Sequence, residues 1–176
     1  LKRRFGTFGF AALVALVIAA GSSALSTSRQ VVMRDDCDPA TFNAAIGPGT
    51  CVKECSTTFS EFIGQLLSRG RAPAWRFAPE RLKLAADGTL EAPNIGGEDH
   101  TFTEVANFGG GRVPPLRVGL MPAPECLAAP PSDDMPPGAI IVLENLSVGN
   151  HFYQCCIHSW MRAQIKVVAT HQDLRN

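Results

Sequence analysis

The most constraining feature of this sequence is the short stretch Tyr153–Met161, in which Cys155, His158 and Met161 follow one another at equal spacing. Cys, His and Met side chains are soft ligands, which together favour a copper ion over hard cations. Because a strand rises about 3.3 Å per residue, Cys155 and Met161 can face one metal ion only if the chain between them turns back. The following residues, Gln164–Val168, alternate between polar and apolar as a strand does. The pattern predicts strand, tight loop, strand.

The run Tyr153-x-Cys155-x-x-His158-x-x-Met161 followed by a β-branched strand resembles the copper-binding loop of the cupredoxins, and its length is most similar to that of the amicyanins. In that family, the Cys, the His and a weak axial Met are three of the four copper ligands. The resemblance implies these roles for Cys155, His158 and Met161.

The fourth ligand of the family is a histidine far upstream. The segment 77–94, which runs into His100-Thr101-Phe102, resembles the family's approach to that ligand, so the resemblance implies His100. The resemblance to the cupredoxins covers roughly residues 74–170. It implies a mainly β fold, a Greek-key β-sandwich, that holds one type 1 copper ion.

Two departures from the family pattern concern the ligand loop. Many cupredoxins carry Asn directly after the first His ligand, where it braces the thiolate loop, whereas this chain has Thr101, whose hydroxyl can take over that bond. The tandem Cys155-Cys156 leaves two candidate thiolates, and the spacing to His158 together with the family pattern selects Cys155. Neighbouring strand residues point to opposite faces, so only one of the two easily reaches a metal. The same argument counts against a binuclear copper centre, because its two bridging cysteines must converge from positions several residues apart.

The chain divides into four parts by composition. Residues 1–26, a basic start followed by an apolar run and small residues, are typical of an export signal peptide. The apolar run is shorter than the ~20 residues of a typical membrane-spanning helix. We therefore expect a periplasmic or secreted protein, in a compartment where disulfides form. Residues 27–73 are expected to form a helical, disulfide-bearing extension, residues 74–170 the copper-binding domain, and residues 171–176 a tail.

Two short helices are expected in the extension. Residues 38–46 begin with the N-cap candidate Asp38 followed by a proline. Residues 58–67 carry apolar side chains at helical spacing, and this face is expected to cover the sandwich. Its members are Phe59, Phe62, Ile63, Leu66 and Leu67.

The chain has six cysteines. With Cys155 as a ligand, five remain, and two disulfides plus one free thiol is the simplest assignment, with the connectivity open. Our choice for the free thiol is Cys156, buried on the face opposite the metal. The other four are Cys37, Cys51, Cys55 and Cys126.

The remaining candidate residues have plainer interpretations. His151 and His171 have no partners at ligand spacing, and we expect both to be solvated. Glu98 and Asp99, in a glycine-rich loop, are expected to be exposed. Asp87-Gly88 is expected to be a hairpin turn, and the glycine- and proline-rich residues 108–137 a long surface loop.

These features favour an electron carrier over an enzyme. The predicted function is single-electron transfer between redox proteins, and a periplasmic copper carrier or buffer is the alternative. A copper oxidoreductase needs an open coordination position or a second copper, for which four histidines are too few. Zinc is the rival metal, but structural zinc seldom uses Met. The family resemblance further implies that the ring edge of His158 reaches solvent, with Trp160 as a docking residue.

Charge and length complete the prediction. The 16 basic residues include Lys2, Arg3 and Arg4, so that 13 face 16 acidic ones beyond the leader, a mildly acidic balance that gives no indication of nucleic-acid binding. At 176 residues the chain can bury one main core. We expect a monomer with an unidentified redox protein as partner, and membrane contact only through the N-terminal signal.

Overall fold

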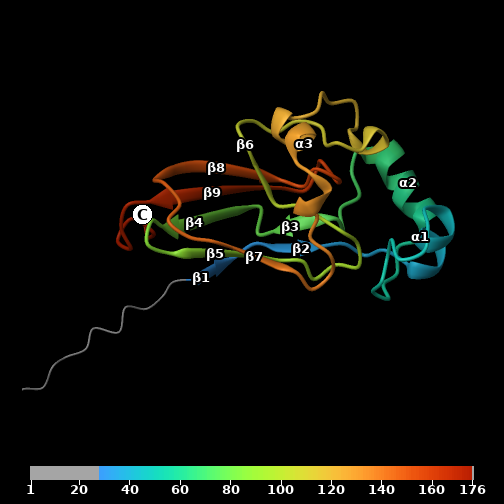
Figure 1. Ribbon diagram of the computed structural model, residues 1–176, viewed down its shortest axis with the longest axis horizontal. Coiled ribbons are helices and arrows are strands. Elements are labelled where there is room, and N and C mark those ends of the chain that lie inside the picture. Colours follow the sequence, from blue (N-terminus) through green and yellow to red (C-terminus); the bar gives the residue numbers. More distant parts are fainter. Residues whose placement is uncertain (1–27, 176) are drawn as a thin grey trace, which may run out of the picture.

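The computed structural model describes residues 28–175, and the proposed signal peptide lies outside them (Figure 1). The described chain is mainly β. Its strands are β1 (Ser28–Gln30), β2 (Val32–Arg34), β3 (Arg76–Ala78), β4 (Arg81–Ala85), β5 (Thr89–Pro93), β6 (Thr103–Val105), β7 (Ile140–Leu143), β8 (Gly149–Gln154) and β9 (Arg162–Val168). Its helices are α1 (Pro39–Ala45), α2 (Phe59–Arg69) and α3 (Pro124–Ala128), with 3-10 turns η1 (Pro114–Leu116) and η2 (Pro131–Asp133).

The strands form three sheets. The largest has the order β4-β9-β8-β6, with β4 parallel to β9 and the other pairs antiparallel. A second sheet has the order β1-β5-β7, and β2 pairs with β3. In Figure 1, β8 and β9 lie above β5 and β7, and buried side chains from both layers form one core. Inward-facing residues of β9 and β5 illustrate the alternation: Ala163, Ile165, Val167, Leu90 and Ala92.

The turn at Asp87-Gly88 joins these layers. The Gly88 N–H donates to the Ala85 carbonyl, so the predicted turn is present. It is no hairpin, however, because β4 pairs with β9 while β5 pairs with β7. The expected hairpin is therefore wrong, since the turn connects two sheets.

Two short strands precede the helices, where the sequence indicated none. β1 runs parallel to β5, and β2 runs antiparallel to β3. Met33 of β2 is fully buried, and its carbonyl accepts a hydrogen bond from Ile95 N–H at 3.0 Å. Residues 28–34 are thus part of the sheets, and they place Asp35 beside the loop that carries His100. Strands of three residues are too short for a period to be visible in the sequence.

Both predicted N-terminal helices are present, and Asp38 caps the first of them as predicted. The Asp38 side chain accepts from the backbone N–H groups of Ala40 and Thr41, and Thr58 and Glu61 form a reciprocal capping box. Gly70 ends α2 in the left-handed conformation, at φ 66°.

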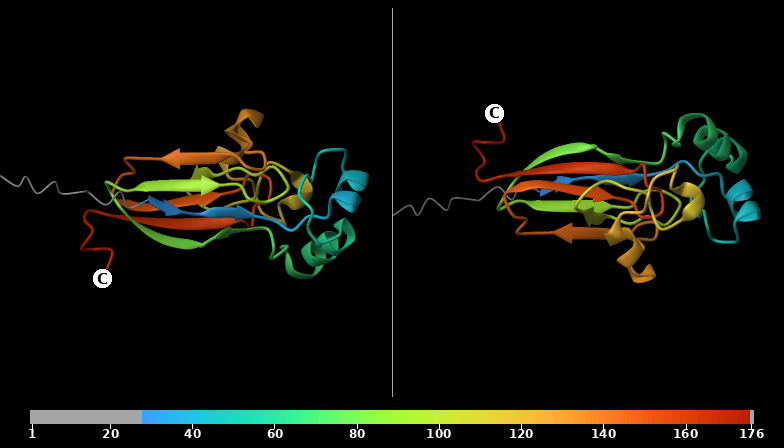
Figure 2. Two further views of the ribbon diagram at one scale, coloured as in Figure 1. Left: turned by 90° about the horizontal axis from the view of Figure 1, so that it is seen from below. Right: turned by 90° about the horizontal axis from the view of Figure 1, so that it is seen from above.

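The helices cover the end of the molecule opposite the C-terminus (Figure 2). Phe59, Ile63 and Leu66 pack against the core and Phe62 is buried, as predicted from their spacing. Leu67 is 83% exposed, so its assignment to this face was wrong.

Two disulfides are present among the described cysteines, Cys37–Cys51 and Cys126–Cys156. The first fastens the α1 segment, as expected of the extension. The second corrects our choice of Cys156 as the free thiol, because the backbone after β8 directs Cys156 toward α3, where Cys126 lies. The free thiols among residues 28–175 belong to Cys155, which is buried, and Cys55, which is half-buried.

The glycine-rich segment packs its backbone directly against the ligand loop. A Cβ atom on Gly111 would lie 2.3 Å from the Cys156 carbonyl oxygen, a contact that only glycine avoids. The next residue, Arg112, donates its N–H to the same oxygen at 2.7 Å. The predicted surface loop, residues 108–137, therefore packs against the loop that follows β8. It is not wholly irregular, because it contains α3 and both 3-10 turns. Within residues 28–175, every helix is too short or too polar to cross a membrane.

Replacing both partners of the second disulfide should lower stability. The double variant Cys126→Ala/Cys156→Ala releases a cross-link between residues 30 positions apart. We expect the free energy of unfolding to fall by about 2–4 kcal/mol. Urea unfolding of the metal-free protein measures this, and Cys55→Ala is the matched control, with little change expected. Equal midpoints for both variants would contradict the assignment.

Candidate metal centre

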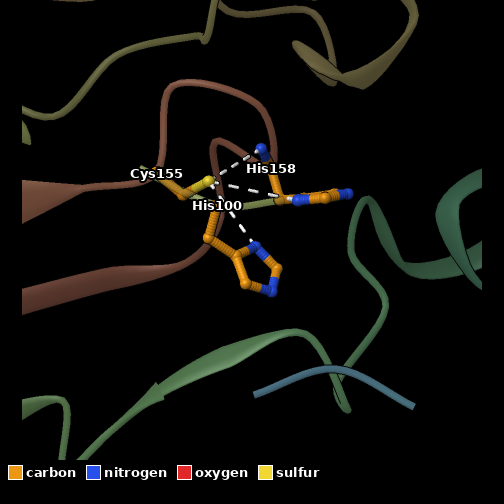
Figure 3. Close-up of side chains that lie close together, drawn as sticks. All are labelled: His100, Cys155 and His158. Carbon is orange, nitrogen blue, oxygen red and sulfur yellow. Dashed lines mark hydrogen bonds between the residues drawn. The ribbon is translucent and has the colours of Figure 1, made fainter. Parts of the chain in front are cut away.

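Three side chains converge at the end of the molecule that α2 covers (Figure 3). His100 precedes β6, Cys155 directly follows β8, and His158 lies in the turn between β8 and β9. The Cys155 Sγ atom is 3.9 Å from His100 Nδ1 and 4.0 Å from His158 Nδ1. The three ligand atoms all lie within 4.8 Å of one another, and all three residues are buried.

The loop that carries two of these residues is closed by its own backbone. Cys155 N–H donates to the Met161 carbonyl at 3.0 Å, and Met161 N–H donates to the His158 carbonyl at 2.9 Å. The predicted strand, tight loop, strand is therefore present. Met161 is fully buried in the core beside this loop.

The Cys155 sulfur is surrounded by donors. The backbone N–H groups of Thr101 and His158 each donate to it at 3.4 Å. Burial alone would raise the pKa of the Cys155 thiol, but hydrogen bonds from His100 and His158 outweigh burial and hold this pKa well below its usual value. The site therefore favours the thiolate, which is the form that binds metals.

The Thr101 side chain braces the loop on the other side. Its hydroxyl oxygen accepts the Cys156 N–H at 2.7 Å and the Thr103 hydroxyl at 3.0 Å. The hydroxyl thus makes the bond that we expected it to take over from the asparagine of the family. Cys156 itself is held away from the metal site by Cys126.

A buried carboxylate, which the sequence did not reveal, orients His100. Asp35 Oδ2 lies 2.9 Å from His100 Nε2, and neither side chain is exposed. Burial alone would lower the pKa of His100, but the bonds to Asp35 and Cys155 raise it to about 9. Asp35 also accepts the N–H groups of Gly97 and Glu98, which fixes the loop before His100. A carboxylate on the outer nitrogen of a ligand histidine fixes the ring orientation and its tautomer.

A second buried carboxylate lies beside His158. Glu98 Oε2 accepts the indole N–H of Trp75 and is 3.7 Å from His158 Nε2. Glu98 is only 6% exposed, so our expectation of an exposed residue was wrong, whereas Asp99 is exposed as expected. Burial raises the pKa of the Glu98 carboxyl group. The glycine-rich sequence gave no indication that the chain folds back over Glu98.

Aromatic side chains close the site above His158. The ring centroids of Trp160, Phe62 and Trp75 lie 5.6, 6.3 and 6.4 Å from that of His158. His158 is only 3% exposed. The expectation that its ring edge reaches solvent is therefore wrong, because α2 supplies Phe62 as a cover.

The other two histidines lie outside this site. His151 is buried, with Nδ1 2.7 Å from Glu104 and Nε2 2.8 Å from the Ser147 carbonyl, so our expectation of a solvated side chain was wrong. His171 is exposed and lies 3.2 Å from Asp87.

The spacing of the three donors suits a metal ion. A metal about 2.0 Å from a histidine nitrogen and about 2.3 Å from a cysteine sulfur holds those atoms roughly 3.5–3.7 Å apart, for angles between tetrahedral and trigonal. The observed sulfur–nitrogen distances are 3.9 and 4.0 Å. The two sulfur–nitrogen pairs therefore need only small inward shifts to bind such an ion. The group His100, Cys155 and His158 can therefore hold a metal.

No protein-family model matches the sequence, and no curated protein matches it either. Solved structures that match include a purple cupredoxin from Nitrosopumilus maritimus, with 12% identity, a TM-score of 0.43 and coverage of 79% of this chain and 98% of that chain. A mutant of amicyanin in the Cu(I) state matches with 17% identity, a TM-score of 0.36 and coverage of 53% and 73%.

A copper-containing nitrite reductase from Thermus scotoductus SA-01 has 17% identity and a TM-score of 0.37, over 54% of this chain and 20% of that chain. Cupredoxins are thus among the matching structures. Since every one of these TM-scores is below 0.5, the metal assignment depends on the site's own residues.

Removing the Thr101 hydroxyl should destabilise the ligand loop. Thr101→Val leaves the buried Cys156 N–H without an acceptor, which costs about 1–3 kcal/mol. Thr101→Ser keeps the acceptor and should lose less. Urea unfolding of the metal-free variants measures the difference, and equal losses would mean that the hydrogen bond contributes nothing.

Metal affinity should fall as the pH falls. Because the pKa of His100 is about 9 in the metal-free protein, metal binding must displace its proton. We expect the apparent Zn²⁺ affinity, measured with this redox-inert ion by competition titration, to fall by about tenfold per pH unit between roughly pH 8 and pH 6. An affinity independent of pH would contradict this assignment.

The same pKa predicts the opposite trend for the metal-free fold. The pKa of His100 is raised from its ordinary value of 6.5, so its contribution to stability is complete below pH 6.5 and is lost as the pH rises through about 9. Thermal midpoints of the metal-free protein should fall over that range. Constant midpoints would contradict the raised pKa.

Proposed function

We propose that this chain is an exported cupredoxin-like protein that binds one type 1 copper ion and transfers single electrons between redox proteins. His100, Cys155 and His158 are the strong ligands and Met161 is the weak axial ligand. The observation that carries this proposal is the convergence of one buried cysteine and two buried histidines within 4.8 Å. In this proposal the sheets form a Greek-key β-sandwich, and the expected N-terminal extension, residues 27–73, is reduced to the helical part after β2, because residues 28–34 belong to the sheets.

The donor set favours copper over zinc. Structural zinc sites are closed by four strong ligands, whereas two histidines, one cysteine and a weak thioether are typical of blue copper. The nearby carboxylates are engaged elsewhere: Asp35 bonds the outer nitrogen of His100, and Glu98 accepts the Trp75 indole. Buried Met161, adjacent to the loop, is the remaining soft donor.

Bound copper would supply a one-electron couple between Cu(I) and Cu(II). The chain's own residues keep the ligands in place in both oxidation states. Asp35 orients His100, Thr101 braces the loop after Cys155, and the loop's backbone bonds hold Cys155 against Met161. Ligands that hardly move require little reorganisation, which supports fast electron transfer.

The cover over His158 supports a relay rather than a copper carrier. Handing over the ion requires a ligand to dissociate and the metal to leave. Phe62, Trp75 and Trp160 all pack against the His158 ring, so departure through this face requires α2 to move.

Export and partners are further parts of the proposal. The basic and apolar pattern of residues 1–26 supports export, and two disulfides suit an oxidising compartment. The mildly acidic balance gives no support for nucleic-acid binding. We propose a monomer that meets its redox partner in the periplasm or outside the cell.

Loading with Cu(II) should give an intense blue or green absorption band. The band arises because a copper–thiolate bond is covalent, so Cys155→Ser should abolish it. Cys55→Ser, at the other free thiol, should leave it intact. Visible absorption and electron paramagnetic resonance measure both. A colourless adduct with the magnetic resonance parameters of an ordinary tetragonal Cu(II) site would contradict the type 1 assignment.

Opening the cover should speed the loss of copper. Phe62→Ala removes a ring that packs against His158, so a mild chelator should strip Cu(I) severalfold faster. Leu67→Ala, at an exposed position of the same helix, is the matched control. Rapid stripping from the unaltered protein within minutes, together with slow electron self-exchange, would favour the carrier.

A further inference from the structure

The closed ligand face raises the question of where electrons enter and leave. His158 is 3% exposed, so a partner cannot touch its ring. Trp160 packs against that ring, with centroids 5.6 Å apart, and is itself half-buried. Its indole N–H is held by the carbonyls of Ala72 and Trp75, each at 3.1 Å. Trp160 is therefore held in a fixed position between His158 and the backbone of residues 72–75.

A cavity of about 180 Å³ is lined by Trp75 and Trp160, the two tryptophans that pack against His158, together with Phe77. Three arginines, Arg71, Arg76 and Arg162, also line it, with Glu80 as the single acidic residue and Pro73 beside them. Aromatic and arginine side chains thus line one cavity, and two of its tryptophans contact His158.

The arginines of this cavity are not neutralised by the chain. Among residues 28–175, none of the three forms an ion pair with a carboxylate. Arg162 is held in place, since it donates to the Ser159 and Gly109 carbonyls. Arg71 and Arg76 are exposed. The cavity is therefore a local positive site, whereas the residues beyond the leader carry 13 basic and 16 acidic side chains.

We propose that this cavity is the docking site of an acidic one-electron redox protein, and that electrons pass between the copper site and that partner through Trp160 and His158. This inference rests on the proposed function. An acidic partner fits because positive and negative patches steer encounter and fix its orientation. In the outward step, Cu(I) loses one electron and becomes Cu(II), and the oxidised partner gains that electron. No bond forms or breaks, and no proton is transferred.

Charged inorganic oxidants test the location of the site. The Cu(I) protein is mixed with hexacyanoferrate(III), an anion, or with tris(phenanthroline)cobalt(III), a cation, in a stopped-flow instrument. The test variant is Arg71→Gln/Arg76→Gln, and Arg29→Gln/Lys166→Gln is the control, with two exposed cations removed from β1 and β9.

At an ionic strength of about 0.01 M, we expect the rate constant with hexacyanoferrate(III) to fall by about tenfold in the test variant. The rate constant with the cationic oxidant should rise. The control should change far less, because its lost charges lie away from the cavity. Equal falls in both variants, or an unchanged rate in the test variant, would overturn the docking site.

A visible spectrum separates the two proposals. If the unaltered protein lacks the charge-transfer band, the proposed function fails. An intact band, with rates in the test variant equal to those of the unaltered protein, overturns only the docking site.

Discussion

The structure depends on the donors that surround one buried sulfur atom, the Sγ atom of Cys155. A buried thiolate is costly unless donors surround it, and Cys155 receives N–H groups from Thr101 and His158 while the rings of His100 and His158 face it. Every one of these groups comes from a loop at one end of the sheets. The strands hold these loops in place, and the loops place the donors around the Cys155 sulfur atom.

The N-terminal segment is a structural part of this site. β2 delivers Asp35 to the outer nitrogen of His100, and α2 delivers Phe62 to the face of His158. The contact with Asp35 sets the orientation and the protonation of His100, and the contact with Phe62 keeps water and partner proteins away from His158. Without this segment, both histidines would be less constrained and His158 would be open on one face. The closed face explains why a route through Trp160 is needed for an electron relay.

Sequence reasoning succeeded where the information is local. Cys155 and His158 lie within one loop, so their spacing together with the family resemblance indicated them, and the N-cap Asp38 directly precedes its helix. Asp35 is 65 residues from its partner His100, and Cys126 is 30 residues from Cys156, distances at which nothing in the pattern specifies the pair. Glu98 and His151 were misjudged for the same reason, because their burial depends on segments that fold over them. The exposed position of His158 was carried over from a family resemblance that does not include α2.

X-ray absorption at the copper edge tests the central claim most directly, since it reports the ligands in each oxidation state. The account predicts one short sulfur ligand and two histidine nitrogens, with nearly the same distances for Cu(I) and Cu(II), because Asp35, Thr101 and the loop backbone hold the donors in place. A shell of nitrogen and oxygen ligands without a short sulfur, or a coordination number that changes on reduction, would contradict it.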